Sequence, residues 1–132
     1  MQSVHHQGVA VYLVEDSTAI RSRMAEMVEQ CHARVVGEAE TADDAIAGIR
    51  SAAPDIVLLD LHLRQGGGLD VLRALGRKRP RPVFIVVTND PTDGYRKACM
   101  AAGATEFLDK SHEFMRIPQI IADAAEHPLT QQ

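Results

Sequence analysis

Acidic residues, a threonine and a lysine stand at the ends of short apolar runs. Glu15-Asp16 follow VAVYLV, Asp60 ends DIVLLD, Thr88 ends VFIVVT and Lys110 follows TEFLD. Clustered carboxylates repel one another unless a cation neutralises them, and Mg²⁺ prefers oxygen ligands of this kind. A lysine adds a compact positive charge that suits a phosphoryl oxygen, and a carboxylate can be the nucleophile in phosphoryl transfer. If these residues meet, they form a site for a phosphoryl group beside a metal ion.

Each of these residues also has an ordinary structural explanation. Asp16 or Ser17 could cap the first helix, and Asp60 could simply end a strand. Lys110 could be a solvated surface charge, and Thr88 suits a strand by its propensity. The hypothesis therefore depends on the combination, because independent accidents rarely place such residues at the ends of so many strands.

The apolar runs alternate with segments of helical periodicity. Strands are expected at 9–14, 34–39, 55–60, 83–88 and 105–109, and helices at 17–31, 41–53, 69–78, 92–102 and 118–126. Uninterrupted apolar strands indicate burial on both faces, and their alternation with helices indicates a parallel sheet. We predict an α/β fold, a three-layer sandwich with a five-stranded parallel sheet of flavodoxin-like order 2-1-3-4-5 and five helices. Ligands of such sheets bind beyond the carboxyl ends of the strands, where the acidic residues lie.

Length and composition indicate one domain. The chain has 132 residues and a formal net charge of -4, and single domains most often run to about 100–150 residues. We expect a domain at 9–126 between tails at 1–8 and 127–132. No basic stripe indicates direct nucleic-acid binding, no apolar run approaches the ~20 residues of a membrane span, and the N-terminus lacks signal-peptide features. We therefore expect a cytoplasmic protein that binds neither nucleic acid nor a membrane, with Cys31 and Cys99 as free thiols.

The set of motifs resembles the receiver domains of bacterial two-component response regulators over about residues 9–126. Its parts are Glu15-Asp16 in YLVEDS, Asp60 in IVLLDL, Thr88 in IVVTND and Lys110 in EFLDKS. The resemblance implies a CheY-like phosphoprotein of a phosphorelay, a signalling switch rather than an enzyme. Its aspartyl phosphate would come from a histidine kinase or a histidine phosphotransfer protein, with Mg²⁺ as cofactor. The face of the fourth helix, fifth strand and fifth helix would then bind an unknown downstream protein or form a homodimer.

The resemblance also implies roles for single residues. Asp60 would be the phosphoacceptor, Lys110 would contact the phosphoryl group and the acids, and Thr88 would move onto a phosphoryl oxygen after transfer. Phe107 would be the aromatic side chain that turns inward when Thr88 moves. The implied Mg²⁺ ligands are Asp16, Asp60, the backbone carbonyl of His62 and, through water, Glu15.

The chain departs from the family's usual pattern in its loops. Arg64 stands where a proline is usual four residues after the phosphoacceptor, Ser111 replaces the proline that usually follows the lysine, and Asn89 is bulkier than the usual alanine or glycine. These changes leave open how rigid the loops are and how accessible the site is. They do not affect the carboxylates that would carry the chemistry. His62 and Asp90 occupy positions that tune hydrolysis of the aspartyl phosphate in this family, and we expect them to line the water's path.

Two other classes of protein fit the sequence less well. A phosphatase or phosphotransferase of the haloacid-dehalogenase type needs a second aspartate two residues after the nucleophile, where this chain has His62, and it needs a cap domain. A flavodoxin-type electron-transfer protein needs a phosphate loop rich in Ser and Thr after the first strand, where this chain has Glu15-Asp16. The scope stays open, since the sequence fits a stand-alone receiver as well as the receiver part of a longer regulator.

Overall fold

The computed structural model describes residues 8–77 and 82–126. Residues 1–7 of the expected tail at 1–8, the expected tail at 127–132 and the expected end of the third helix at Lys78 lie outside the described residues. Within those ranges the elements follow one another as β1 (Ala10–Val14), α1 (Thr18–Gln30), β2 (Arg34–Ala39), α2 (Ala42–Ala52), β3 (Ile56–Leu59), α3 (Gly68–Leu75), β4 (Val83–Thr88), α4 (Asp93–Ala101), β5 (Ala104–Asp109), the 3-10 turn η2 (Phe114–Arg116) and α5 (Ile117–Glu126).

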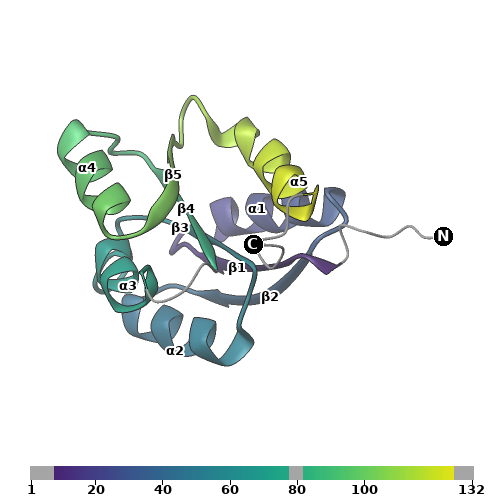
Figure 1. Cartoon of the computed structure of the whole chain (residues 1–132), viewed down its shortest axis with the longest axis horizontal. Coiled ribbons are helices and arrows are strands. Elements are labelled where there is room, and N and C mark those ends of the chain that lie inside the picture. The colour runs from purple at the N-terminus through teal and green to yellow at the C-terminus, as the bar shows by residue number, and fades with distance from the viewer. Residues whose placement is uncertain (1–7, 78–81, 127–132) are drawn as a thin grey trace.

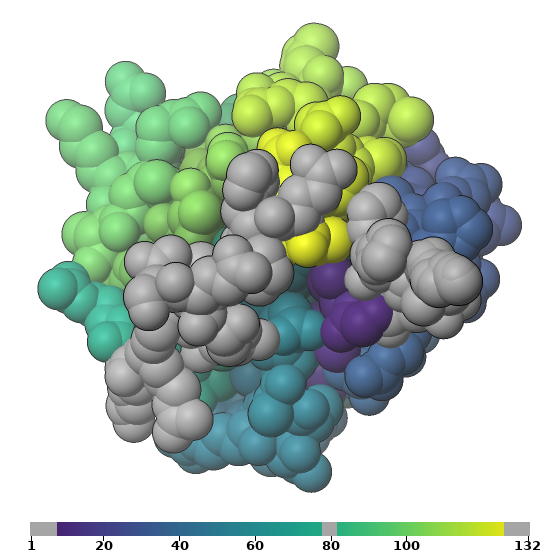
Figure 2. All heavy atoms as spheres, turned by 45° about the vertical axis from the view of Figure 1, so that its right-hand side comes forward, coloured from purple at the N-terminus to yellow at the C-terminus, as the bar shows by residue number. Residues whose placement is uncertain are grey.

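The predicted architecture is confirmed. The five strands form one parallel sheet of order β2-β1-β3-β4-β5. One core lies between the sheet and α1 and α5, and the other lies between the sheet and α2, α3 and α4 (Figure 1). The space-filling view shows the end of α5 beside the start of β1, which closes the first of these cores (Figure 2). None of the described helices is both long and apolar enough to cross a membrane.

Side-chain caps fix where α1, α2 and α4 begin, the last of them through the Thr92 hydroxyl. Ser17 Oγ accepts a hydrogen bond from the Ile20 N–H at 3.3 Å, so Ser17 and not Asp16 caps α1. The hydroxyl of Thr41 accepts one from the Asp44 N–H at 3.2 Å, as the sequence spacing predicts for the start of α2. The cap on α1 has a consequence for the site, because it leaves the Asp16 carboxylate available for another role.

Backbone pairing continues past the strand ends and fixes the main chain of the candidate residues. A residue that follows one strand donates its N–H to the carbonyl of a residue on the neighbouring strand. The pairs are Glu15 N–H to Ala39 O at 3.0 Å, Asp60 N–H to Val14 O at 3.0 Å and Lys110 N–H to Thr88 O at 2.8 Å. The sheet therefore holds these residues at one edge whatever their side chains do.

The segment between β5 and α5 differs from the prediction. The last helix begins at Ile117, in agreement with the predicted start near Pro118, but a 3-10 turn at Phe114–Arg116 that the sequence did not predict comes before it. The Phe114 ring is buried, and the guanidinium of Arg23 on α1 lies 4.6 Å from its centroid. Burial of an aromatic ring explains this extra turn, which helical periodicity alone does not reveal.

Candidate functional site

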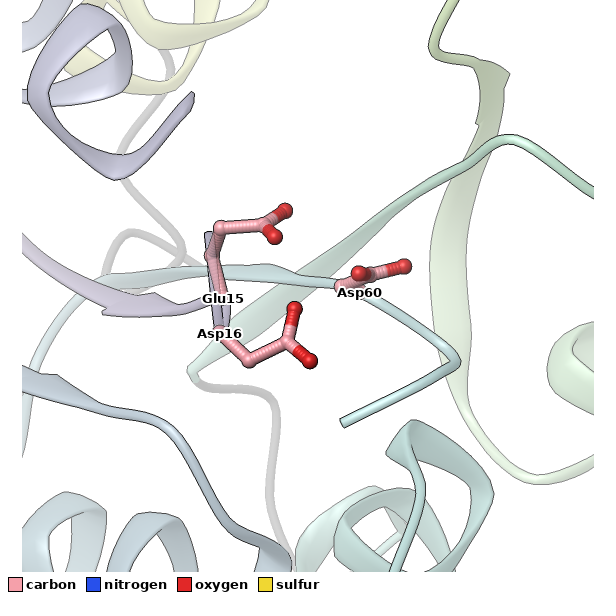
Figure 3. A group of neighbouring side chains, drawn as sticks. All are labelled: Glu15, Asp16 and Asp60. Atoms are coloured by element: carbon pink, nitrogen blue, oxygen red, sulfur yellow. The ribbon is translucent and has the colours of Figure 1, made fainter. Parts of the chain in front are cut away.

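Three carboxylates meet at the carboxyl edge of the sheet, as predicted. Glu15 and Asp16 follow β1 and Asp60 follows β3, and each offers an oxygen within 4.8 Å of the others. Figure 3 shows the Glu15 and Asp16 side chains both extending from their stretch of main chain toward the side on which Asp60 lies. Three negative charges at this separation repel one another strongly unless a cation lies among them.

Lys110 supplies one cation. Its Nζ lies 2.8 Å from Glu15 Oε1 and 3.3 Å from Asp60 Oδ2, so a single ammonium joins the ends of β1, β3 and β5. The side chains are nearly covered, with 8% of Lys110, 1% of Glu15 and 8% of Asp60 exposed. Because water screens this group so little, the charges must compensate one another within the protein.

Burial also acts on the proton affinity of Glu15. Burial raises the pKa of the Glu15 carboxyl, and the hydrogen bonds from Lys110 and from the Ser17 N–H oppose this rise. A carboxyl whose pKa is raised has too little positive charge around it to offset the loss of water.

The donor set suits Mg²⁺. It consists of hard carboxylate oxygens from two neighbouring strand ends, and the three acids outnumber the single lysine. Asp16 is exposed and is not needed as the cap of α1. The His62 N–H donates weakly to Asp60 Oδ1 at 3.4 Å, so the main chain of His62 lies against the same carboxylate. The residues present thus fit a magnesium site.

Thr88 ends β4, which lies next to β3, and Phe107 lies on β5, which lies next to β4. Thr88 is fully buried, and its hydroxyl accepts a hydrogen bond from the Asp90 N–H at 3.0 Å. The ring of Phe107 is buried as well, so it already lies inward in this structure. The guanidinium of Arg96 lies 4.8 Å from the centroid of that ring and donates to the Phe107 carbonyl at 3.3 Å, which ties α4 to β5.

The β3–α3 loop is held in place without the usual proline. The Arg64 N–H donates to the Glu40 carbonyl at 3.1 Å, and the Ala42 N–H donates to the Gln65 carbonyl at 3.0 Å. At Gly68 a side chain would collide with the carbonyl oxygen of Asp60, so only glycine allows α3 to start so close to the site. Hydrogen bonds to the β2–α2 connection thus hold the β3–α3 loop in place, although it lacks the usual proline.

The loop after Lys110 is likewise closed by local hydrogen bonds. Asp109 accepts from the Ser111 N–H at 2.9 Å and lies 2.9 Å from Nδ1 of His112, while its own N–H donates to Glu113 at 2.8 Å. The hydrogen bond with His112, followed by the one from Ser111, lowers the pKa of Asp109. These contacts fix the loop in which Ser111 replaces the usual proline.

Sequence reasoning missed three residues around the site. Arg21, Tyr95 and Arg96 each contact a candidate residue, yet none stands at a strand end or in a recognisable spacing. His62 Nε2 lies 3.4 Å from Asp90 Oδ2, and the His62 ring meets the edge of Tyr95 at a centroid distance of 5.6 Å. Such contacts join different loops and helices, so no local signal could have identified them.

Comparison with known proteins gives a consistent result. Residues 11–122 match the family described as "Response regulator receiver domain". The chain is 30% identical to the response regulator GacA of Pseudomonas aeruginosa over 86% of its own length and 53% of that protein. It is also 30% identical to a protein-glutamate methylesterase/protein-glutamine glutaminase of Idiomarina loihiensis, over 80% of its length and 28% of that protein. The chain thus spans about half or less of these relatives. A DNA-binding response regulator of the LuxR family from Staphylococcus aureus shares the fold, with a TM-score of 0.80 at 19% identity over 89% of this chain and 98% of that one.

Proposed function

The chain belongs to the response regulator receiver domain family, and from that premise we propose that it is a phosphorylation switch whose phosphoacceptor is Asp60. One observation carries the assignment to this residue. Glu15 and Asp60 both lie in the acidic cluster and contact the Lys110 ammonium, but of the two only Asp60 follows the central strand β3, next to the strand that ends in Thr88. A phosphoryl group on it would have a cation on one side and the buried Thr88 hydroxyl on the neighbouring strand.

The chemistry is a transfer between two nucleophiles. A carboxylate oxygen of Asp60 attacks the phosphorus of a phosphohistidine donor, the P–N bond breaks, and the bonding electron pair stays on the imidazole nitrogen. Lys110 orients the Asp60 carboxylate and stabilises negative charge on the phosphoryl oxygens. Mg²⁺, when held by Glu15, Asp16, Asp60 and the His62 carbonyl, would neutralise charge on the transferring group.

The proposed role of Asp60 also implies a phosphoryl donor and a downstream partner. We infer that the phosphoryl group comes from a histidine kinase or a histidine phosphotransfer protein. Thr88 moving onto the phosphoryl oxygen would give up the hydrogen bond from Asp90 and so act on the start of α4, which Arg96 ties to Phe107. The face of α4, β5 and α5 would then bind a downstream protein or a second copy of the chain. The chain would act as a switch and catalyse only its own phosphorylation and dephosphorylation.

Intact-mass measurement tests the phosphoacceptor. The chain is incubated with a small phosphoryl donor, with and without Mg²⁺, beside Asp60→Ala. We expect a Mg²⁺-dependent phosphoryl adduct that disappears in the variant. Asp109→Asn is the matched control, because it removes another acid at the same edge of the sheet and should keep the adduct. An adduct that survives in Asp60→Ala would assign the phosphoryl group elsewhere. Failure of the wild type with both a small donor and a phosphorylated histidine phosphotransfer protein would overturn the switch itself.

His62 and Asp90 are proposed to set the lifetime of the aspartyl phosphate. Their side chains approach to 3.4 Å from opposite loops, with 56% of His62 and 48% of Asp90 exposed. They therefore lie where solvent meets the site, and Tyr95 supports the imidazole from α4. A pair that spans the two loops restricts the approach of water to the phosphorus.

Dephosphorylation rates test this role. We expect the double variant His62→Ala/Asp90→Ala to lose its phosphoryl group about two- to ten-fold faster than the wild type, since shielding by one exposed pair is worth roughly 1 kcal/mol. The side chain of Lys97 on α4 is exposed, and Lys97→Ala serves as the control. An unchanged rate in the double variant would show that the pair does not line the water's path.

A further inference from the structure

Arg21, on α1, lies between the end of β1, which carries Glu15 and Asp16, and the residues that end and follow β2. Three of its nitrogens meet three acceptors: Nη1 donates to the Glu15 carbonyl at 2.6 Å, Nε lies 2.7 Å from Glu38 Oε1 and Nη2 lies 3.1 Å from Glu40 Oε2. Only 13% of the Arg21 side chain is exposed. A largely buried guanidinium that donates to three acceptors in a fixed fork positions the groups that it binds.

Glu40 continues this chain of contacts to the other half of the site. Its second carboxylate oxygen lies 3.4 Å from Arg64 Nε, and its carbonyl accepts the Arg64 N–H at 3.1 Å. Arg64 belongs to the short loop that leaves Asp60 and His62, which closes on itself through the bridge between His62 and Gly67. A continuous path therefore runs from the carbonyl of Glu15 through Arg21 and Glu40 to the β3–α3 loop.

We infer that Arg21, Glu40 and Arg64 form a clamp that sets the spacing between the two groups of Mg²⁺ ligands; this inference rests on the proposed metal site. One end of the clamp holds the main chain beside Asp16, and the other holds the loop that carries His62. The three residues touch neither metal nor phosphoryl group and are positioning residues. The clamp restrains the β3–α3 loop by contacts with the β2–α2 connection, where other members of the family have a proline in the loop.

The charges of the clamp allow a discriminating test by calorimetric titration of the whole chain with Mg²⁺. Arg64→Met removes a positive charge near a cation site, so electrostatics alone would strengthen Mg²⁺ binding. The clamp requires the opposite, and we expect Mg²⁺ affinity to fall about three- to ten-fold, at or below the range usual for residues that orient metal ligands. Arg64 is exposed, which makes a failure to fold improbable as the cause.

Glu40 and Glu38 provide a matched pair. Both contact Arg21, but of the two only Glu40 also contacts Arg64. Glu40→Gln and Glu38→Gln each remove one negative charge, so both variants lose the same attraction for Mg²⁺. We expect Glu40→Gln to weaken Mg²⁺ binding clearly more than Glu38→Gln, and the double variant Glu40→Gln/Arg64→Met to be no weaker than the worse single variant, as expected for residues acting as one unit. Without Mg²⁺, hydrogen exchange at the Ala42 amide, which donates to the Gln65 carbonyl, should speed up in Arg64→Met and not in Glu38→Gln.

The outcomes separate the two levels of the proposal. Mg²⁺ affinity equal to or tighter than wild type in Arg64→Met, or equal losses in the two glutamate variants, would overturn the clamp and leave the metal site standing. A wild-type chain that binds no Mg²⁺ would overturn the metal site and the clamp with it. At saturating Mg²⁺ the clamp variants should be phosphorylated at the wild-type rate, whereas a general structural defect would slow them at every Mg²⁺ concentration.

Discussion

Lys110 and Arg116 lie on the same segment after β5, and each bridges two carboxylates. Lys110 lies 2.8 Å from Glu15 and 3.3 Å from Asp60, while Arg116 lies 3.0 Å from Glu113 and 3.7 Å from Glu106. The lysine is 8% exposed and the arginine is 52% exposed. The pattern of charges is nearly the same in the two places, so burial is what separates them.

The two environments place different demands on the chain. In the buried group, neither the cation nor the acids can turn to water, and loss of one partner leaves the others uncompensated. In the exposed group, water and salt replace a missing partner at little cost. A site for phosphoryl chemistry needs the first environment, and the fold supplies it by bringing three strand ends together.

The largest expected effect comes from removing the buried cation. Lys110→Met leaves Glu15 and Asp60 covered without their ammonium, and we expect the free energy of unfolding to fall by about 3 kcal/mol in the absence of divalent ions. Arg116→Met is the matched variant on the exposed pair, and its loss should stay below about 1 kcal/mol. Urea denaturation with a chelator measures both.

Adding Mg²⁺ sharpens this comparison. Mg²⁺ bound by the acids stabilises every chain that keeps the cluster, so each variant is compared with the wild type at the same Mg²⁺ concentration. We expect Mg²⁺ to reduce the loss of Lys110→Met, because the bound cation partly replaces the missing ammonium, and to leave the loss of Arg116→Met unchanged. Equal losses in the two variants would contradict the difference in environment that the exposures indicate. A Lys110→Met loss that Mg²⁺ does not reduce would argue against the metal site.

Much of the buried group could be predicted from the sequence. Asp60, Thr88 and Lys110 close apolar runs, and parallel strands bring such ends to one edge, so type and order along the chain were sufficient. The prediction left open whether Asp16 or Ser17 caps α1, because both have suitable side chains, and the hydrogen bond of Ser17 to Ile20 decides between them.

The surroundings of the site could not be predicted in the same way. Arg21 meets Glu38 and Glu40 because β2 lies beside β1, and Arg64 meets Glu40 because the β2–α2 and β3–α3 connections pair with each other. These contacts depend on loop paths that hydrophobic periodicity does not encode. The sequence likewise names Tyr12 as a strand residue but not its packing, where a side chain on Gly37 or Gly48 would collide with the tyrosine.

The smallest effect on stability is expected at Asp109, whose hydrogen bonds lie in the exposed loop after β5. The contact with His112 and the Ser111 N–H holds the pKa of Asp109 below its usual value. The folded chain therefore binds fewer protons at this group than the unfolded chain. The resulting stability is present above the ordinary pKa of an aspartate, about 3.9, and is lost as pH falls through the lower pKa of the folded state.

Denaturation midpoints of the wild type and Asp109→Asn, followed from neutral to acid pH, measure this contribution. We expect a small difference above the usual aspartate range, because asparagine can still accept from the Ser111 N–H but carries no charge for His112. The difference should shrink as the pH falls below the usual aspartate range, where Asp109 itself is protonated. A difference that grew toward acid pH would mean that the pKa of Asp109 is raised in the folded protein, and a difference as large as that of Lys110→Met would mean that this exposed loop is coupled to the buried group.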